Sequence, residues 1–122
     1  MSEELPYQRL QRHFHEPVRL AILSLLVHEV DGLSFNQLKE GLDLTFGNLD
    51  RHLKVLSEAE VVSVHKITGK GRPLTMVSLS DVGRVQFLEY LDSLEIMLRQ
   101  ASQSVEERRS SDELGGALPS EA

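Results

Sequence analysis

Residues 45–59 read TFGNLDRHLKVLSEA, and the pattern of this stretch decides how the rest of the chain is interpreted. At about 100° per residue, its apolar positions gather on one side of a helix and its small or cationic positions on the other. Thr45 stands where an N-cap hydroxyl is favoured. We therefore expect a helix through Ala59 that exposes Gly47, Arg51 and Lys54. Its expected buried positions are Leu49, His52, Leu53 and Leu56.

A strand, a loop and a second strand are expected after this helix. Residues 61–67 and 74–79 are rich in β-branched side chains, which favour strands. The residues between them, 68–73, read TGKGRP, a glycine-punctuated loop that carries Lys70 and Arg72. The pattern predicts a β-hairpin with a basic tip.

Two more helices are expected before the helix that begins at Thr45. The apolar spacing of residues 17–30 predicts the first, and Asp31-Gly32 is expected to end it. Ser34 and Gln37 form a capping-box pattern that opens the second, which should end near Leu42. A tight turn then leads into the third helix.

The order helix, helix, helix, strand, basic loop, strand is that of a winged helix-turn-helix. We therefore predict a mainly α fold with a small β-hairpin (α+β), in which residues 17–80 form the domain. Residues 1–16 are expected to be a helical extension, because Tyr7, Leu10 and Phe14 share one helical face.

A long final helix is predicted over residues 81–104, capped by Ser80 with Asp81. Its apolar residues follow a heptad spacing, which is typical of either an intramolecular packing stripe or a dimer interface. This seam consists of Phe87, Leu91, Leu94, Leu98, Ala101 and Val105. We favour dimerisation because a domain this small covers little of so long a helix, and we expect Leu88 and Ile96 to pack on the domain. Residues 105–122 are polar and are predicted to be a disordered tail.

Charge is distributed unevenly along the chain. The net charge is −6, which is unusual for a protein that binds a polyanion. Residues 45–72, however, carry five basic and three acidic side chains and form a segment of net charge +2. Because the local field decides where a polyanion docks, this segment is the candidate nucleic-acid interface.

Each exposed residue of the third helix has an expected role on DNA. Gly47 permits close approach, and Arg51 can donate two hydrogen bonds to guanine. Asn48 can pair with adenine or contact a phosphate, and Lys54 is placed for the phosphate backbone. Asp50 is tolerated there if it accepts from cytosine N4 or orients Arg51.

Two further expectations concern the edges of this surface. Phe46 is nearly in helical register with Leu53, so we expect it in the core, with a contact to a thymine methyl group as the alternative. Lys70 and Arg72 form the tip of the hairpin, or wing, and are expected to reach phosphates or the adjacent minor groove; the alternative is a solvated loop.

The chain resembles the MarR-like and ArsR-like winged-helix transcriptional regulators, in particular their compact single-domain members. The resemblance rests on GNLDRHLKVL at residues 47–56, on GRP at residues 71–73, and on single positions around them. Those positions are Ala59, Val61, Val62, Val64, Lys66, Thr75, Leu79 and Gly83. The chain departs from the pattern at Glu60, where such sequences usually have a turn glycine, at Asp50, and at Leu74.

The resemblance implies a homodimer joined through terminal helices and operator binding that usually represses transcription. By match, Asn48, Arg51 and His52 fall in the recognition helix and Arg72 in the wing. The complete predicted DNA-binding set is Thr45, Gly47, Asn48, Asp50, Arg51, His52, Lys54, Lys70 and Arg72. The predicted dimerisation set is Phe87, Leu91, Leu94, Leu98 and Ala101.

Several kinds of chemistry are not expected. The chain has no cysteine, its histidines are scattered, and it contains no phosphate-binding loop, dinucleotide fingerprint or nucleophile elbow. We therefore expect no metal, no cofactor and no enzyme activity, and we expect a cytoplasmic protein with no membrane span. The predicted partners are a palindromic operator in double-stranded DNA and a second copy of the chain. A small-molecule effector between the dimer helices and the core stays open.

Two hypotheses about function follow from these residues. The first is a dimeric DNA-binding regulator, most simply a repressor. The second is a winged-helix module that binds another protein and no longer reads DNA, which the acidic balance and Asp50 would favour.

Overall fold

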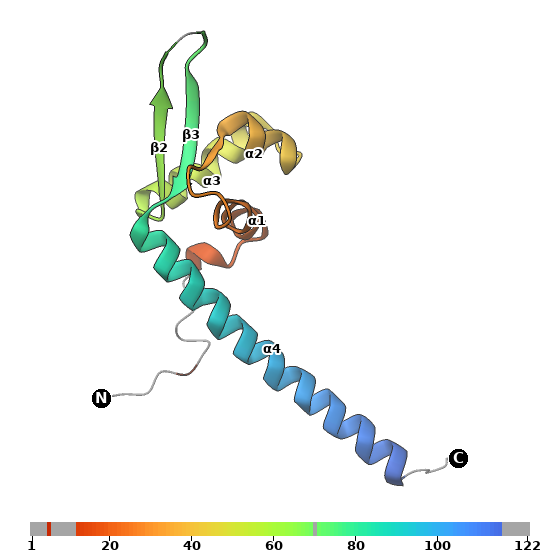
Figure 1. Cartoon of the computed structure of the whole chain (residues 1–122). Helices are drawn as coiled ribbons and strands as arrows, with labels where there is room; N and C mark the ends of the chain where they lie inside the picture. Colours follow the sequence, from red (N-terminus) through yellow and green to blue (C-terminus); the bar gives the residue numbers. More distant parts are fainter. Residues whose placement is uncertain (1–4, 6–11, 70, 116–122) are drawn as a thin grey trace.

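The computed structural model describes residue 5 and residues 12–69 and 71–115. Figure 1 shows a small domain of helices and strands at one end and a long helix that extends away from it. In chain order the elements are a 3-10 helix η2 (Arg12–Phe14), α1 (Pro17–Leu26), β1 (Leu33–Ser34), α2 (Phe35–Gly41), α3 (Phe46–Glu58), β2 (Val62–Ile67), β3 (Leu74–Leu79) and α4 (Asp81–Gly115). The predicted winged-helix fold, mainly α with a small hairpin, is confirmed.

The sheet has one strand more than the predicted hairpin. Its order is β1-β3-β2, and both pairings are antiparallel, with Val64 opposite Val77 and Leu33 on the other side of Val77. Gly32 has a φ of +86°, and a Cβ there would overlap the carbonyl oxygen of Val77. Only glycine allows the chain to approach β3 so closely.

Helix α1 ends earlier than the sequence predicted. The expected end was at residues 31–32, but the helix stops at Leu26, and Val30 is 85% exposed. Arg84 of α4 donates a hydrogen bond of 2.8 Å to the carbonyl oxygen of Val27. A cation at this position satisfies a carbonyl group that a helix leaves free at its end, so a distant residue stabilises the early termination.

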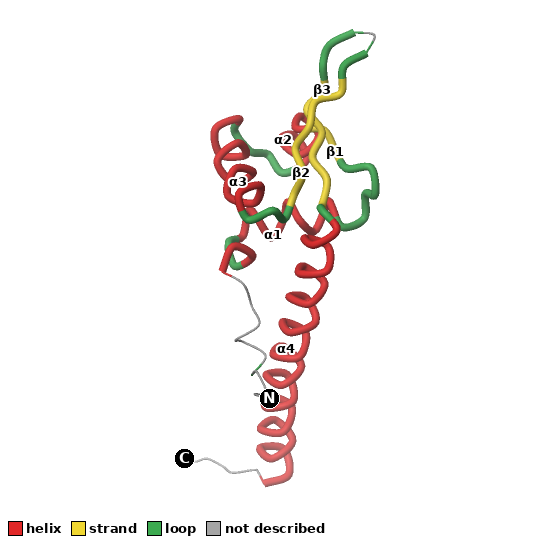
Figure 2. Tube along the Cα trace, turned by 90° about the vertical axis from the view of Figure 1, so that its left-hand side faces the viewer, coloured by secondary structure: helices red, strands yellow, loops and turns green. Residues whose placement is uncertain are grey.

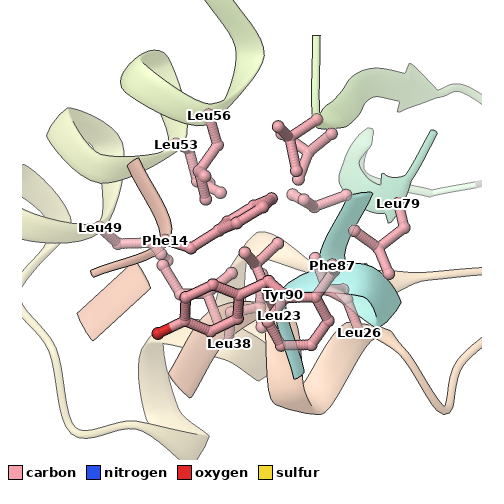
Figure 3. Packing of buried hydrophobic residues seen from close by; sticks show 14 residues of the cluster. Phe14, Leu23, Leu26, Leu38, Leu49, Leu53, Leu56, Leu79, Phe87 and Tyr90 are labelled. Atoms are coloured by element: carbon pink, nitrogen blue, oxygen red, sulfur yellow. The ribbon is translucent and has the colours of Figure 1, made fainter. Parts of the chain in front are cut away.

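The core lies between α1, α3, the sheet and the start of α4, and Figure 3 shows its packing. Phe14 is completely buried, with its ring centroid 5.7 Å from that of Phe87 and 5.2 Å from that of Tyr90. Such edge-on and tilted pairs stabilise a core beyond their buried area. Phe14 therefore anchors the η2 segment to α4. Tyr7 and Leu10, predicted on the same helical face, lie outside the described residues.

The junction of α3, β2 and α4 is closely packed. Ser80 Oγ accepts a hydrogen bond of 2.8 Å from the backbone N–H of Gly83, so the predicted cap of the last helix is confirmed. The same hydroxyl group lies 2.7 Å from the carbonyl oxygen of Glu60. A Cβ on Gly83 would overlap the carbonyl oxygen of Val61, so glycine allows α4 to start directly against the connection between α3 and β2.

Helix α4 continues beyond its predicted end. Residues 105–115 are helical, whereas the sequence analysis placed a disordered tail from residue 105. Low hydrophobicity indicated disorder, but glutamate and arginine are good helix formers, and Glu106 and Arg109 form an i,i+3 ion pair of 3.3 Å. In both Figure 1 and Figure 2 the C-terminal half of this helix extends away from the other described elements.

Candidate nucleic-acid interface

Helix α3 presents the polar face that the sequence predicted. Thr45 is its N-cap, and the Thr45 hydroxyl accepts a hydrogen bond of 3.1 Å from the backbone N–H of Asn48. The buried side chains of the helix are Leu49, His52, Leu53 and Leu56. Because these residues hold the helix against the core, its opposite face is free to contact a partner.

Three residues of the first two turns form the centre of the exposed face. Gly47 has no atom within 4 Å of the position that a Cβ would occupy, so nothing in the described part of the chain obstructs approach to the backbone there. Arg51 Nη2 donates a hydrogen bond of 3.0 Å to Asn48 Oδ1, and both side chains are exposed. This contact orients the guanidinium group and leaves most of its donors free.

One of the two expectations for Asp50 was that it orients Arg51, and the structure shows that it does not. Its carboxylate contacts Lys54, with Oδ2 3.1 Å from Nζ in an i,i+4 ion pair. Both groups lie at the edge of the exposed face, where Lys54 is 73% exposed. The carboxylate therefore neutralises a cation that was expected to contact a phosphate.

His52 lies in the interior, although it was predicted to be in the DNA-binding set. Its side chain is 3% exposed, with Nδ1 3.2 Å from Arg19 Nη1 and Nε2 3.7 Å from Glu16 Oε2. Burial lowers the pKa of His52. The attraction of Glu16 raises the pKa, but it does not offset burial and the positive charges of Arg51 and Arg19, which lower it. The residue positions α3 against α1 and does not reach the exposed face.

Phe46 was expected in the core, and this expectation is wrong because the side chain is largely exposed. Its side chain is 62% exposed, and its ring centroid lies 4.9 Å from that of Phe35, with 44° between the ring planes. The register with Leu53 is right, but Phe46 lies two turns nearer the N-terminus. Its neighbour there is the start of α2 instead of the sheet, so the ring has an aromatic partner on one side and solvent on the other.

The hairpin β2–β3 forms the second part of the surface. Arg72 is exposed in its loop, and Lys70 lies outside the described residues. A groove of about 460 Å³ separates the hairpin from α3 and the start of α2. Its lining includes Phe35, Phe46, Asp50, Lys54 and Leu74.

The groove is not predictable from the apolar pattern of the sequence. The apolar side chains of Phe46, Val64 and Leu74 are between 44% and 62% exposed, and an apolar pattern alone does not distinguish such positions from core positions. Two local signals bear on the walls of the groove. The hairpin loop indicates the wing, and the capping box at Ser34 indicates the start of α2.

The predicted dimerisation seam divides into two parts. Phe87 is fully buried in the chain's own core, and Leu91 and Leu94 pack partly against it. Leu98 is 60% exposed, and Ala101 is also exposed. Off the seam, Leu88 is 50% exposed, so the expectation that it packs on the domain is wrong. Phe87 is therefore part of the core, whereas the distal part of the seam is the most exposed.

Two kinds of feature are absent from the described residues, a metal-binding cluster and a helix able to span a membrane. Within the described ranges, no three His, Cys, Asp or Glu side chains are grouped as a metal ion would require. Among the helices of the same residues, none combines the length and apolar character needed to cross a bilayer.

Comparison with known protein families gives a match over most of the chain. A family model described as a winged helix DNA-binding domain matches residues 18–98. A curated relative, an uncharacterised protein of Methanocaldococcus jannaschii, is 44% identical over 78 residues, which cover 64% of this chain and 84% of the relative.

Solved structures share the same architecture. A transcriptional regulator homologue from Pyrococcus horikoshii is 32% identical with a TM-score of 0.73, over 81% of this chain and 98% of that one. MepR of S. aureus, in a complex with DNA, is 16% identical with a TM-score of 0.65, over 88% of this chain and 87% of that one. At this identity the likeness to MepR concerns the fold alone.

Proposed function

Because the chain belongs to the winged helix DNA-binding domain family, we propose that it regulates transcription by binding a specific sequence of double-stranded DNA through α3 and the hairpin. The observation that carries this proposal is the unobstructed face of α3, where Gly47, Asn48 and Arg51 lie together beside the hairpin groove. The family match also favours this hypothesis over that of a protein-binding module.

Recognition of bases is assigned to the first two turns of α3. A helix that enters the major groove contacts base edges with its N-terminal residues. The absence of a side chain at Gly47 lets the helix lie deep in the groove. Arg51, oriented by Asn48, is placed to donate two hydrogen bonds to the O6 and N7 atoms of guanine.

The part of the affinity that does not depend on DNA sequence is assigned to the hairpin, because Lys54 is engaged by Asp50. Arg72 is exposed in the hairpin loop, where it can reach a phosphate or the minor groove next to the major groove that α3 occupies. Lys70 belongs to the same loop in the sequence. Each phosphate that these cations neutralise releases counterions, so binding should weaken steeply as salt is added.

The contact with a second copy of the chain is assigned to the distal part of α4. Leu98 and Val105 are 60% and 54% exposed, and with Ala101 they continue the apolar seam after it leaves the core. An isolated helix is only marginally stable in water, so a partner helix packed on this stripe would stabilise it. A two-fold dimer would present two α3 helices to successive major grooves, about 34 Å apart, and would bind a palindrome. Repression would follow if that site overlaps a promoter.

Genomic binding-site selection with the purified full chain tests the proposal. We expect recovered fragments that share a palindrome, and we expect Arg51→Ala and Arg72→Ala each to weaken binding to them by about tenfold. Arg12→Ala is the matched control, because this exposed arginine belongs to η2, away from the α3 face. If no DNA is retained at low salt and a single protein is captured from lysate instead, the protein-binding hypothesis replaces this one.

A further inference from the structure

Phe46 is a large apolar side chain at the edge of the polar face of α3, where it lines the groove between α3 and the hairpin. It is the first residue of α3, directly before Gly47 and Asn48, and it is 62% exposed. Phe35 of α2 supports the ring from one side, at a centroid distance of 4.9 Å. The ring therefore has a fixed support on one side, and its exposed part lines the groove beside the polar face of α3.

A dimer formed through α4 would not cover this ring. The seam residues Leu98 and Val105 lie on the distal part of α4, which extends away from the end of the domain that carries α2, α3 and the hairpin (Figures 1 and 2). Phe46 also makes no core contact that explains its size, since it does not belong to the buried cluster. Its exposed face is thus left for the partner of α3.

The major groove of DNA offers one apolar group to such a side chain. Guanine, cytosine and adenine present only hydrogen-bond donors and acceptors there, whereas thymine also presents its C5-methyl group. Resting on the proposed DNA-binding function, we propose that Phe46 is a specificity-determining residue that packs against the methyl group of one thymine in each half-site. Arg51 then reads guanine by hydrogen bonds, and Phe46 reads thymine by apolar contact.

The expected effect follows from the size of the buried group. Burial of one methyl group strengthens association by about fourfold, so the two symmetric thymines of a palindrome together contribute about 15-fold. Deoxyuridine pairs with adenine as thymidine does but lacks the methyl group. Its substitution therefore removes the proposed contact and leaves the hydrogen bonds of the base pair unchanged.

The experiment uses a duplex recovered by genomic selection, with each symmetric pair of thymidines replaced in turn by deoxyuridine. For the wild-type protein, we expect one pair whose replacement weakens binding by about 15-fold. The Phe46→Ala variant should bind the unmodified duplex about as weakly as the wild type binds the modified one, and it should be insensitive to the replacement. The wild-type measurement detects the methyl contact, and the residual binding of Phe46→Ala shows that the variant is folded and assigns the contact to Phe46.

Val30→Ala is the matched control, because Val30 is an apolar residue that is 85% exposed in the connection before β1. It should retain the full sensitivity to deoxyuridine. The proposal is overturned if the wild type binds every modified duplex equally well, or if Phe46→Ala remains as sensitive as the wild type. If selection recovers no duplex at all, the proposed function fails and the role of Phe46 fails with it.

Discussion

Arg19 Nη1 lies 3.2 Å from Nδ1 of His52, and this contact joins the first turn of α1 to the buried side of α3. A guanidinium group has only donors, so Nδ1 of the imidazole ring must accept. The ring proton therefore resides on Nε2, which faces Glu16 Oε2 at 3.7 Å. His52 is neutral in this arrangement, and its protonation would place an N–H group against the guanidinium.

The first prediction is that the free energy of unfolding decreases as the pH is lowered below neutrality. Burial lowers the pKa of His52 below 6.5, and the charges of Arg51 and Arg19 lower it further. Burial also lowers the pKa of His13, with the charge of Arg19 as the second cause. Between the folded pKa and 6.5 the unfolded chain binds more protons, so the free energy of unfolding decreases as the pH falls through this window. Thermal unfolding at pH 7.5 and about pH 5.5 measures the effect.

A substitution separates the contribution of His52 from other acid effects. The His52→Gln variant cannot titrate, and its amide oxygen can still accept from Arg19, so its melting temperature should depend less on pH than that of the wild type. The exposed His65→Gln serves as the control and should behave as the wild type does. An equal pH dependence in all three proteins would contradict the role assigned to His52.

The second prediction concerns the backbone at Glu60. Helix α3 ends in a Schellman motif, in which the N–H of Val61 bonds to the carbonyl oxygen of Leu56 at 2.9 Å. The motif requires a left-handed residue, and Glu60 occupies this position with a φ of +61°. Glycine adopts this conformation without steric penalty, so Glu60→Gly should raise the free energy of unfolding by about 0.5–1 kcal/mol.

Urea unfolding checks this prediction. Asp43 has a φ of +53° in the corresponding turn after α2, but aspartate tolerates the left-handed region better than glutamate does. Asp43→Gly should therefore stabilise the protein less than Glu60→Gly. An unchanged or lower midpoint for Glu60→Gly would show that its conformation is not strained.

Elements with local signals were predictable from the sequence. Ser34 and Gln37 form the expected capping box, with hydrogen bonds of 3.0 Å and 2.8 Å, and Thr45 caps α3 as its position predicted. Elements that depend on contacts distant in the sequence were not predictable in this way. Strand β1 has only two residues and forms by pairing with β3, and the end of α1 at Val27 depends on Arg84, 57 residues away.

The candidate site was predictable to a similar extent. The face that contains Gly47 and Arg51 followed from helical periodicity, because α3 is strongly amphipathic. The same periodicity placed His52 on the buried side, whereas family resemblance placed it on DNA, and the structure agrees with periodicity. For Phe46 periodicity was wrong, because it describes the direction of a side chain and not whether another element lies there.

The third prediction concerns the ion pair between Asp50 and Lys54. Removal of the carboxylate in Asp50→Asn leaves Lys54 free to contact a phosphate and removes a negative charge near the DNA. Binding to a selected duplex should therefore become tighter, and the dependence of log K on log salt should steepen by about 0.9 for one added phosphate contact. Binding isotherms at several salt concentrations measure both quantities.

Glu95→Gln provides a closely matched control for Asp50→Asn. Glu95 forms the same kind of exposed i,i+4 ion pair, 3.0 Å from Arg99, and its substitution changes the net charge by the same amount on α4. Its salt dependence should match that of the wild type. If the two variants strengthened DNA binding equally, net charge alone would be responsible, and Asp50 would have no local effect on Lys54.

The last prediction tests the distal part of α4. Leu98→Asp places a charge on the exposed seam without touching the core, so the dissociation constant of the proposed dimer should rise by at least about tenfold. Operator affinity should fall with it, because two linked recognition helices bind more tightly than one. Sedimentation equilibrium measures the mass, and Val30→Asp controls for adding a charge at an exposed apolar position. A Leu98→Asp protein that stays dimeric would place the interface elsewhere on the chain, whereas a monomeric wild type would remove the basis for a palindromic site.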